Sequence, residues 1–244
     1  MQYRTLGRTG KRVSLLGLGS MKFGRTEGLR YPTGEAPPTL TGLATLLAQA
    51  RELGVNLLDT APACGVSEER LGELLSAQRQ HWVLCTKVGE SFVSGRSCFD
   101  FSAAQTRASV QRSPQRLRTS YLDIVLIHSD GNDTAIIEDG GAFDALAQLQ
   151  RQGLVRAYGM SHKTVTGAAL AVERCDVVMA PLNLAQRAEL DVIVSAPKHG
   201  CGVLIKRPFD SGNGAGARWS AGATSSSSPV PRVFRASSSA PQRC

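Results

Sequence analysis

Seven short apolar runs, separated by longer segments of helical periodicity, limit the fold of this chain more than any other feature. Runs rich in Val, Ile and Leu predict buried strands, and the segments between them predict helices. Parallel neighbours need a crossover connection, which a helix supplies, so the pattern predicts an α/β fold with a parallel sheet. The predicted strands cover residues 15–20, 56–60, 83–87, 124–129, 155–161, 177–183 and 202–206.

Seven β/α units in strict succession favour a (β/α)8 barrel of the TIM type over an open sheet. The first residues, with Gly7 and Gly10 at a turn, predict an N-terminal hairpin at the barrel floor. A closed barrel needs an eighth strand, but the end of the chain is rich in Ser, Pro and Arg. We therefore expect a barrel-like domain over 1–212, truncated to about seven units, and a disordered low-complexity tail over 213–244.

Capping residues and breakers mark the predicted helices. Gly54 follows an apolar helical face and can adopt the left-handed conformation that ends a helix. Ser67, Ser102 and Thr164 mark helix starts. Pro114 falls inside the helix that begins at Ser102, where the missing amide costs about 3 kcal/mol and predicts a kink.

The charge of the chain gives little support for nucleic-acid binding. The net charge is +8, but Arg218, Arg232, Arg235 and Arg243 of the predicted tail contribute half of it and have no acidic neighbours there. Elsewhere the basic residues are interspersed with acids, and the aromatic content of 5% offers no platform for base stacking. A dedicated nucleic-acid function is disfavoured, although polyanion binding by the tail stays open.

Six scattered cysteines without a Cys-x-x-Cys pair predict free thiols in a reducing compartment, and no disulfide or zinc framework. No apolar run approaches the roughly 18 to 20 residues of a membrane span, and the first residues lack an apolar segment of signal-peptide type. We therefore expect a cytoplasmic protein with no membrane partner and no metal site.

Polar residues end three of the predicted strands, where a barrel of this kind carries its reacting groups. They are Asp59, Lys87 and His128. Each alone has an ordinary structural interpretation: a capping aspartate, a lysine that reaches solvent, a histidine satisfied in the core. On successive strands of one barrel, however, all three would lie near one centre, and this combination favours a catalytic role.

Six short motifs follow one another over residues 1–212: RTLGRTG at 4–10, LGLGSM at 16–21, DTAPACGVSE at 59–68, TKVG at 86–89, DIVLIH at 123–128 and GMS at 159–161. In their order and spacing they resemble the motifs of the aldo-keto reductases. The resemblance implies NADPH-dependent reduction of an aldehyde or ketone, with the nicotinamide across the carboxyl-terminal mouth of the barrel.

An Asp, a Tyr, a Lys and a His form the active centre of that family, and Asp59, Lys87 and His128 match three of them. The resemblance implies that the lysine, held by the aspartate, lowers the pKa of the tyrosine, and that the histidine orients the carbonyl oxygen. These groups are needed because hydride transfer to a carbonyl leaves an alkoxide, which must be protonated where free charge is costly.

Cys64 stands where the resemblance places the proton-donating tyrosine. A free thiol has a pKa of about 8.5 and can release a proton near a lysine. Its sulfur, however, lies roughly 3 Å from its own Cα, a tyrosine hydroxyl lies about 6 to 7 Å away, and proton transfer needs about 2.6 to 3.2 Å. A bridging water and a plain small apolar role both stay open for Cys64, and we expect catalysis to be impaired.

The resemblance also implies a set of cofactor contacts. They follow the first, fifth and sixth predicted strands, around the nicotinamide, and continue into a basic loop after the seventh that resembles the pyrophosphate cover. His162 follows the carboxamide-binding position and has no defined family role. The set is Ser20, Met21, Ser161, His162, Asn183, Lys206, Arg207 and Gly212.

These observations favour an NAD(P)H-dependent reductase of a small-molecule aldehyde or ketone, weakened by Cys64 and by the missing last β/α unit. NADP is the expected cofactor, and the sequence leaves NAD open. The alternative is a non-catalytic, nucleotide-binding or regulatory barrel. An unclosed parallel sheet exposes unpaired backbone groups, so we also expect homo-oligomers through its open edge.

Overall fold

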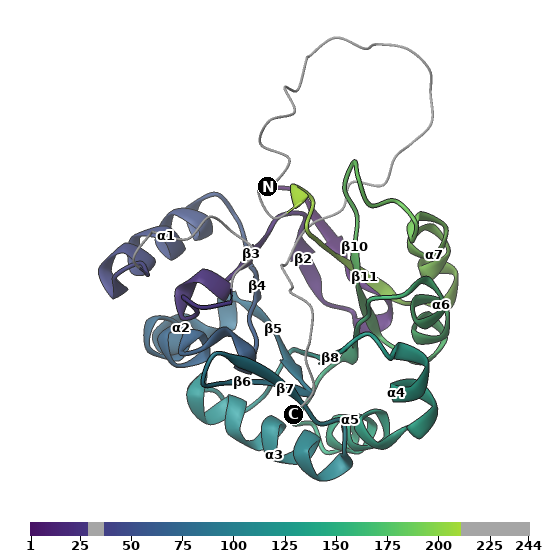
Figure 1. Ribbon diagram of the computed structural model, residues 1–244. Helices are drawn as coiled ribbons and strands as arrows, with labels where there is room; N and C mark the ends of the chain where they lie inside the picture. Colours follow the sequence, from purple (N-terminus) through teal and green to yellow (C-terminus); the bar gives the residue numbers. More distant parts are fainter. Residues whose placement is uncertain (29–36, 211–244) are drawn as a thin grey trace, which may run out of the picture.

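The computed structural model describes residues 1–28 and 37–210 of the chain. A seven-stranded parallel sheet forms its centre, in the order β11-β10-β9-β8-β5-β4-β3. The sheet curls into a half-barrel with helices on its outer side, and all seven predicted strands are present (Figure 1). These strands are β3 (Gly17–Gly19), β4 (Leu57–Asp59), β5 (Val83–Val88), β8 (Ile124–His128), β9 (Tyr158–Ser161), β10 (Val177–Pro181) and β11 (Gly202–Lys206).

Helices connect successive strands. Ser102 and Thr164 cap two of them as predicted, each accepting a hydrogen bond from the backbone three residues on, at 3.2 and 3.1 Å. A third helix begins at Ser67, whose hydroxyl bonds to Ser20 instead of capping the helix, and the helix that contains Pro114 continues through it. The described helices are α1 (Leu40–Glu52), α2 (Ser67–Leu75), α3 (Ala103–Arg116), α4 (Asp133–Asp139), α5 (Gly141–Arg151), α6 (Val165–Arg174) and α7 (Leu190–Ser195).

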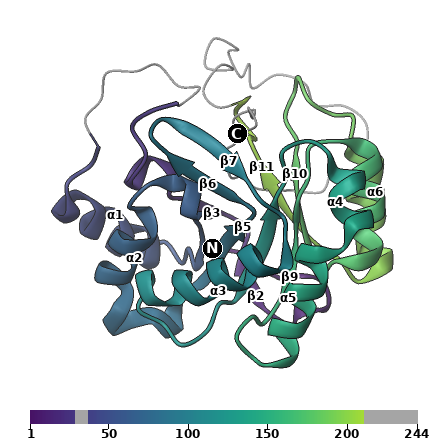
Figure 2. The ribbon, with the colours of Figure 1, turned by 60° about the horizontal axis from the view of Figure 1, so that its bottom comes forward.

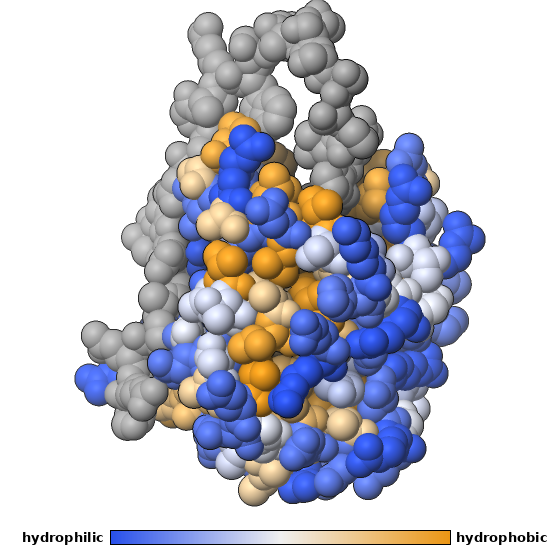
Figure 3. Space-filling model, turned by 90° about the vertical axis from the view of Figure 1, so that its right-hand side faces the viewer, coloured by the Kyte–Doolittle hydropathy of each residue, from blue (hydrophilic) through white to orange (hydrophobic). Residues whose placement is uncertain are grey.

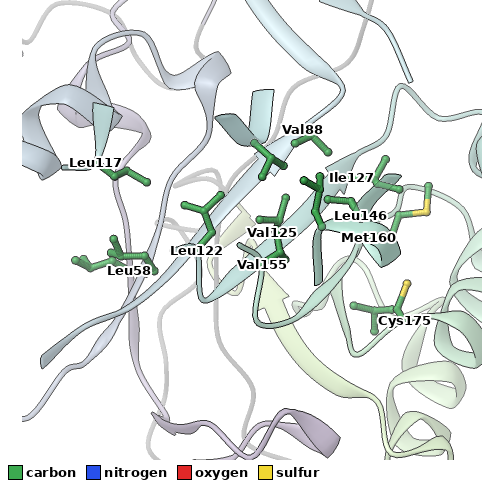
Figure 4. Packing of buried hydrophobic residues seen from close by; sticks show 14 of the residues in the cluster. Leu58, Val88, Leu117, Leu122, Val125, Ile127, Leu146, Val155, Met160 and Cys175 are labelled. Atoms are coloured by element: carbon green, nitrogen blue, oxygen red, sulfur yellow. The ribbon is translucent and has the colours of Figure 1, made fainter. Parts of the chain in front are cut away.

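The core has two layers because successive residues of a strand point to opposite faces of the sheet. Ile127 of β8 packs outward in a cluster that includes Leu146 of α5 (Figure 4). Its neighbour Leu126 belongs to an inner cluster with Leu6 and Val13. The parallel sheet is therefore buried on both faces, by helices outside and by its own side chains inside.

An antiparallel hairpin of β1 (Tyr3–Thr5) and β2 (Arg12–Ser14) covers the end of the half-barrel at which the strands begin. Arg8, in the turn of this hairpin, donates its backbone amide to Gly200 O at 2.6 Å. Its side chain lies 3.0 Å from the carboxylate of Asp176. The predicted floor hairpin is thus confirmed, and it is bonded to the segments that precede β10 and β11.

A second hairpin, which the sequence patterns did not reveal, follows β5 at the opposite end of the half-barrel. It consists of β6 (Glu90–Val93) and β7 (Arg96–Phe99), and Figure 2 draws it in front of the central strands. Ser94 and Gly95 form its two-residue turn with φ angles of 49° and 79°. A Ser-Gly pair between two short runs is a hairpin signal that could have predicted it.

The half-barrel is open on one side, as the sequence predicted, since no described strand pairs with the outer edges of β3 and β11. A cavity of about 580 Å³ lies along this opening, and both edge strands and the floor hairpin line it. Leu57, Met179 and Leu204 of the inner cluster reach its wall. Figure 3 views the molecule from the side of α6 and α7 and shows hydrophobic residues gathered in a strip on that face.

No helix among the described residues combines the length and the hydropathy needed to cross a membrane, and no group of His, Cys, Asp and Glu side chains there could hold a metal ion. The predicted tail, with Gly212, lies outside the described residues. The cysteines that are described are free thiols: Cys64, Cys85, Cys98, Cys175 and Cys201.

Candidate active site

Asp59, Lys87 and His128 lie together where three neighbouring strands end. Asp59 and His128 are the last residues of β4 and β8, and Lys87 is next to last in β5, which lies between them. All three line one cavity of about 20 Å³. The convergence expected from the sequence is therefore present in the fold.

Lys87 is held as an ammonium group inside the protein. Its Nζ lies 2.6 Å from Asp59 Oδ1 and donates to Thr60 O at 2.8 Å. Burial acts to lower the pKa of Lys87, but the Asp59 carboxylate and other neighbours outweigh it, so the pKa lies above its usual value. Two of its three N–H groups are used in these bonds, and the third is available to a ligand.

Cys64 lines the same cavity and ends a short 3-10 turn, Pro62–Cys64, after β4. Burial raises the pKa of its thiol to about 12, although Lys87 acts in the opposite direction. The thiol is therefore neutral over the physiological range. Met21 and Phe92 pack against it in a small apolar cluster.

Glu90, which the sequence patterns did not identify, contacts the catalytic candidate His128. The Oε2 atom of Glu90 lies 2.5 Å from His128 Nδ1, and its Oε1 atom accepts a hydrogen bond from Ser97 at 2.6 Å. Burial acts to raise the pKa of Glu90, but His128, Ser97 and Arg25 together lower it to about 2. Burial also lowers the pKa of His128, against the opposing effect of Glu90.

Arg25 is a second unpredicted neighbour of this cavity. It is buried, its guanidinium lies 3.6 Å from the centre of the Phe92 ring, and it donates to Ala63 O at 3.3 Å. Burial lowers the pKa of Arg25 and Glu90 raises it. The sequence pattern did not predict Arg25 or Glu90 as site residues, because neither residue ends a strand of the barrel.

Ser20 and Met21, predicted near the nicotinamide, follow β3 beside the same cavity. Ser20 is fully buried, and its hydroxyl donates to Asp59 O at 2.9 Å and accepts from Ser67 at 2.7 Å. Met21 lines the cavity. Ser20 therefore joins the end of β3 to the end of β4, because its side chain bonds the backbone carbonyl of the candidate catalytic aspartate.

Ser161, His162 and Lys206 form a second buried group at the ends of β9 and β11. Lys206 is 2% exposed, and its Nζ donates to Ser161 Oγ at 2.9 Å and to His162 O at 2.7 Å. Burial lowers the pKa of Lys206 to about 7. His162 Nδ1 lies 3.2 Å from Glu189 Oε2, and His162 Nε2 has no hydrogen-bond partner among the described residues. Lys206 is thus an internal contact and not an exposed loop cation.

Asn183 connects two loops at this end of the sheet. Its side-chain amide donates to Arg207 O at 2.9 Å, and its Oδ1 accepts from the backbone of Gln186 at 2.8 Å. Arg207 has a φ of 58°, unusual for a residue with a side chain, and follows β11 directly. Of the predicted cofactor residues, Gly212 alone falls outside the described ranges.

A model of the aldo/keto reductase family matches residues 15–218. The chain belongs to this family. A solved structure, a putative aldo-keto reductase from Pseudomonas aeruginosa, is 53% identical with a TM-score of 0.78, covering 84% of this chain and 77% of that one.

Two curated relatives agree with this assignment. The uncharacterized oxidoreductase YqkF of Bacillus subtilis is 28% identical over 87% of this chain, and L-galactose dehydrogenase of Arabidopsis thaliana is 31% identical over 82%. The chain spans 66% and 57% of their respective lengths. The family match extends past the domain boundary predicted at 212.

Proposed function

We propose that this aldo/keto reductase family member reduces an aldehyde or ketone with NAD(P)H, and that Asp59, Lys87 and His128 carry the reaction. The observation that carries the proposal is the buried Lys87–Asp59 ion pair in a cavity shared with His128. A buried ion pair is costly to maintain, so its position at the mouth of the half-barrel favours a functional role over a structural one.

Lys87 and His128 would stabilise the carbonyl oxygen as negative charge develops on it, and Asp59 would hold Lys87 in place for this. Fixed N–H donors in a site with little water are worth far more than the same groups in solution. Asp59 and Thr60 O hold the Lys87 ammonium in place, so no reorganisation is needed when charge appears. His128, on the next strand, provides a second nitrogen toward the same cavity.

The residues at the ends of β9, β10 and β11 are suited to hold a nicotinamide cofactor, which supplies the hydride when it is bound. His162 Nε2 is buried without a hydrogen-bond partner among the described residues, and a polar ligand group such as a carboxamide would satisfy it. Ser161, Asn183 and Arg207 would complete the contacts. NADP is the proposed form, and a fluorescence titration that compares NADPH with NADH tests it.

Stopped-flow measurement of NADPH oxidation with a panel of aldehydes, sugars included, tests the activity. We expect Lys87→Met to lower the rate by at least about 100-fold, because it removes a fixed charge from the oxyanion site. Lys198→Met, a change at an exposed lysine, is the matched control. Equal rates in wild type and Lys87→Met would overturn the proposed mechanism.

Cys64 is the specific observation that favours a second candidate, a nucleotide-binding protein without hydride transfer. Its thiol is neutral and short compared with a phenol. Tight NADPH binding together with no turnover of any aldehyde would select this alternative. Turnover that depends on Lys87 would exclude it.

A further inference from the structure

We propose that His128, held at Nδ1 by Glu90, is the proton donor of this chain. The inference rests on the proposed reductase function and assigns one step of it. Glu90 is then a positioning residue, since it contacts the imidazole and not the reacting atoms. No sequence motif assigns proton donation to His128 or positioning to Glu90. The proposal starts from the 2.5 Å contact between the two side chains.

The contact fixes which nitrogen of His128 carries hydrogen. Glu90 is an ionised carboxylate, because Ser97, Arg25 and His128 lower its pKa to about 2 against the effect of burial. At 2.5 Å a carboxylate oxygen can face Nδ1 only when that nitrogen carries hydrogen, because two lone pairs would repel each other, so we assign the hydrogen to Nδ1. In neutral His128 the Nε2 atom is therefore bare, and an Nε2–H group exists only in the imidazolium form.

This tautomer decides how a carbonyl substrate can bind. A bare Nε2 would face the lone pairs of the carbonyl oxygen, which is unfavourable, whereas the imidazolium donates a hydrogen bond to that oxygen. As the carbonyl carbon receives the hydride, an O–H bond forms and the Nε2–H bond breaks. The substrate is reduced, the dihydronicotinamide is oxidised, and neutral His128 takes its next proton from water.

The other acids of the cavity are weaker donors. Efficient proton transfer near neutrality calls for an acid whose pKa is close to the working pH. Burial raises the pKa of Cys64 to about 12, and the pKa of Lys87 lies above its usual value. Donation by Lys87 would also break its ion pair with Asp59. His128 is the imidazole among the described lining residues, and an ordinary imidazole titrates closer to neutral pH than a thiol or an ammonium group does.

The charged groups around His128 determine the direction of its pH dependence. Burial has the largest effect and lowers its pKa, Glu90 on β6 raises it, and Lys87 on β5 and Lys206 on β11 lower it. Arg25 and Asp59 line the same cavity. Because the net pKa lies below its usual value, the rate of reduction should rise as the pH falls toward the acidic side of 7.

The tautomer is testable in the protein without cofactor. Nitrogen-15 spectra of labelled histidines should show His128 as the Nδ1–H form, with His128→Gln identifying its signals. Glu90→Gln should move its titration to lower pH, since the amide can still accept from Nδ1 but carries no charge. The control Glu52→Gln, at an exposed glutamate of α1, should leave the titration of His128 unchanged. An Nε2–H form in the wild type would overturn the assignment.

The donor role itself is tested by kcat/KM against pH. We expect Cys64→Ala to retain the rise of kcat/KM toward acidic pH at whatever absolute rate it shows, and Glu90→Gln to lower kcat/KM at neutral pH by about tenfold, with partial rescue near pH 5. Activity of His128→Gln equal to wild type, or loss of the acidic rise in Cys64→Ala, would overturn the donor role. If no variant oxidises NADPH, the proposed function fails with the donor role, while the histidine spectra still decide whether Glu90 sets the tautomer.

Discussion

Cys64 is the residue at which the chemistry of this chain departs most from its family resemblance. The cavity that it lines, about 20 Å³, has room for one water molecule and none for a phenol ring. Met21 and Phe92 pack against the thiol, and the guanidinium of Arg25 lies 3.6 Å from the centre of the Phe92 ring. The side chains around Cys64 therefore pack closely against a small residue and leave no space for a larger one.

Cys64→Tyr should raise the rate of aldehyde reduction by about 100-fold, because a phenol adds a donor of sufficient reach. The same change should lower the free energy of unfolding by about 1 to 3 kcal/mol, since the ring must displace Phe92 and Arg25. Stopped-flow kinetics and urea unfolding measure the two effects. A faster enzyme without any loss of stability would contradict the packing argument.

Lys206 gives the protein a pH-dependent stability. Burial lowers its pKa to about 7, whereas in the unfolded chain it titrates near 10.5. Between these values the unfolded state binds one more proton than the folded state, so stability rises with pH through this window.

The difference in free energy of unfolding between wild type and Lys206→Met isolates the contribution of Lys206. The buried thiols titrate in both proteins, so their contribution cancels in this difference. Between pH 7 and 8.5 the wild type should gain about 2 kcal/mol in free energy of unfolding relative to the variant. Denaturant titrations at several pH values measure it, with Lys198→Met as the control at an exposed position. A constant difference would mean that Lys206 is charged in the folded protein.

At the scale of secondary-structure elements, the hairpin β6–β7 does most to shape the candidate site. It brings Glu90 to His128 and Phe92 to Arg25, yet its strands are short and, within residues 1–28 and 37–210, pair only with each other. The sequence predicted the barrel strands because they are apolar runs between helical segments, and so it predicted that Asp59, Lys87 and His128 lie together at neighbouring strand ends. It did not predict Glu90, because this residue lies in a short strand of mixed polar and apolar residues and its contact with His128 on β8 leaves no local signal.

Gly95→Val should weaken this hairpin, because Gly95 has a φ of 79° that a β-branched residue resists. We expect faster hydrogen exchange in β6 and β7 and a stability loss of about 1 to 2 kcal/mol. Gly95→Asn is the matched control, since asparagine tolerates positive φ. Unchanged exchange in Gly95→Val would mean that Glu90 and Phe92 hold the hairpin without help from its turn.

For the whole molecule, the alternation of apolar runs and helical segments predicted the number of strands in the central sheet and their parallel arrangement, which follow from local periodicity and from the geometry of crossover connections. The turn glycines Gly7 and Gly10 predicted the floor hairpin. The opening between β3 and β11 was expected from the change in composition after residue 212. Its size, a cavity of about 580 Å³, could not be predicted because it depends on how far the sheet curls.

The open edges should make the protein self-associate, because β3 and β11 present unpaired backbone groups in the described part of the chain. Sedimentation velocity should show species larger than a monomer that increase with protein concentration. A monodisperse monomer that unfolds cooperatively would contradict this expectation and would imply that the edges are covered.

The bond between Arg8 N and Gly200 O joins two points 192 residues apart in the chain. A growing polypeptide leaves the ribosome from its amino terminus, so the first hairpin must wait for nearly the whole half-barrel before its acceptor exists. Until then Leu6 and Val13 have no complete surface to cover, and their early exposure invites chaperone binding during translation.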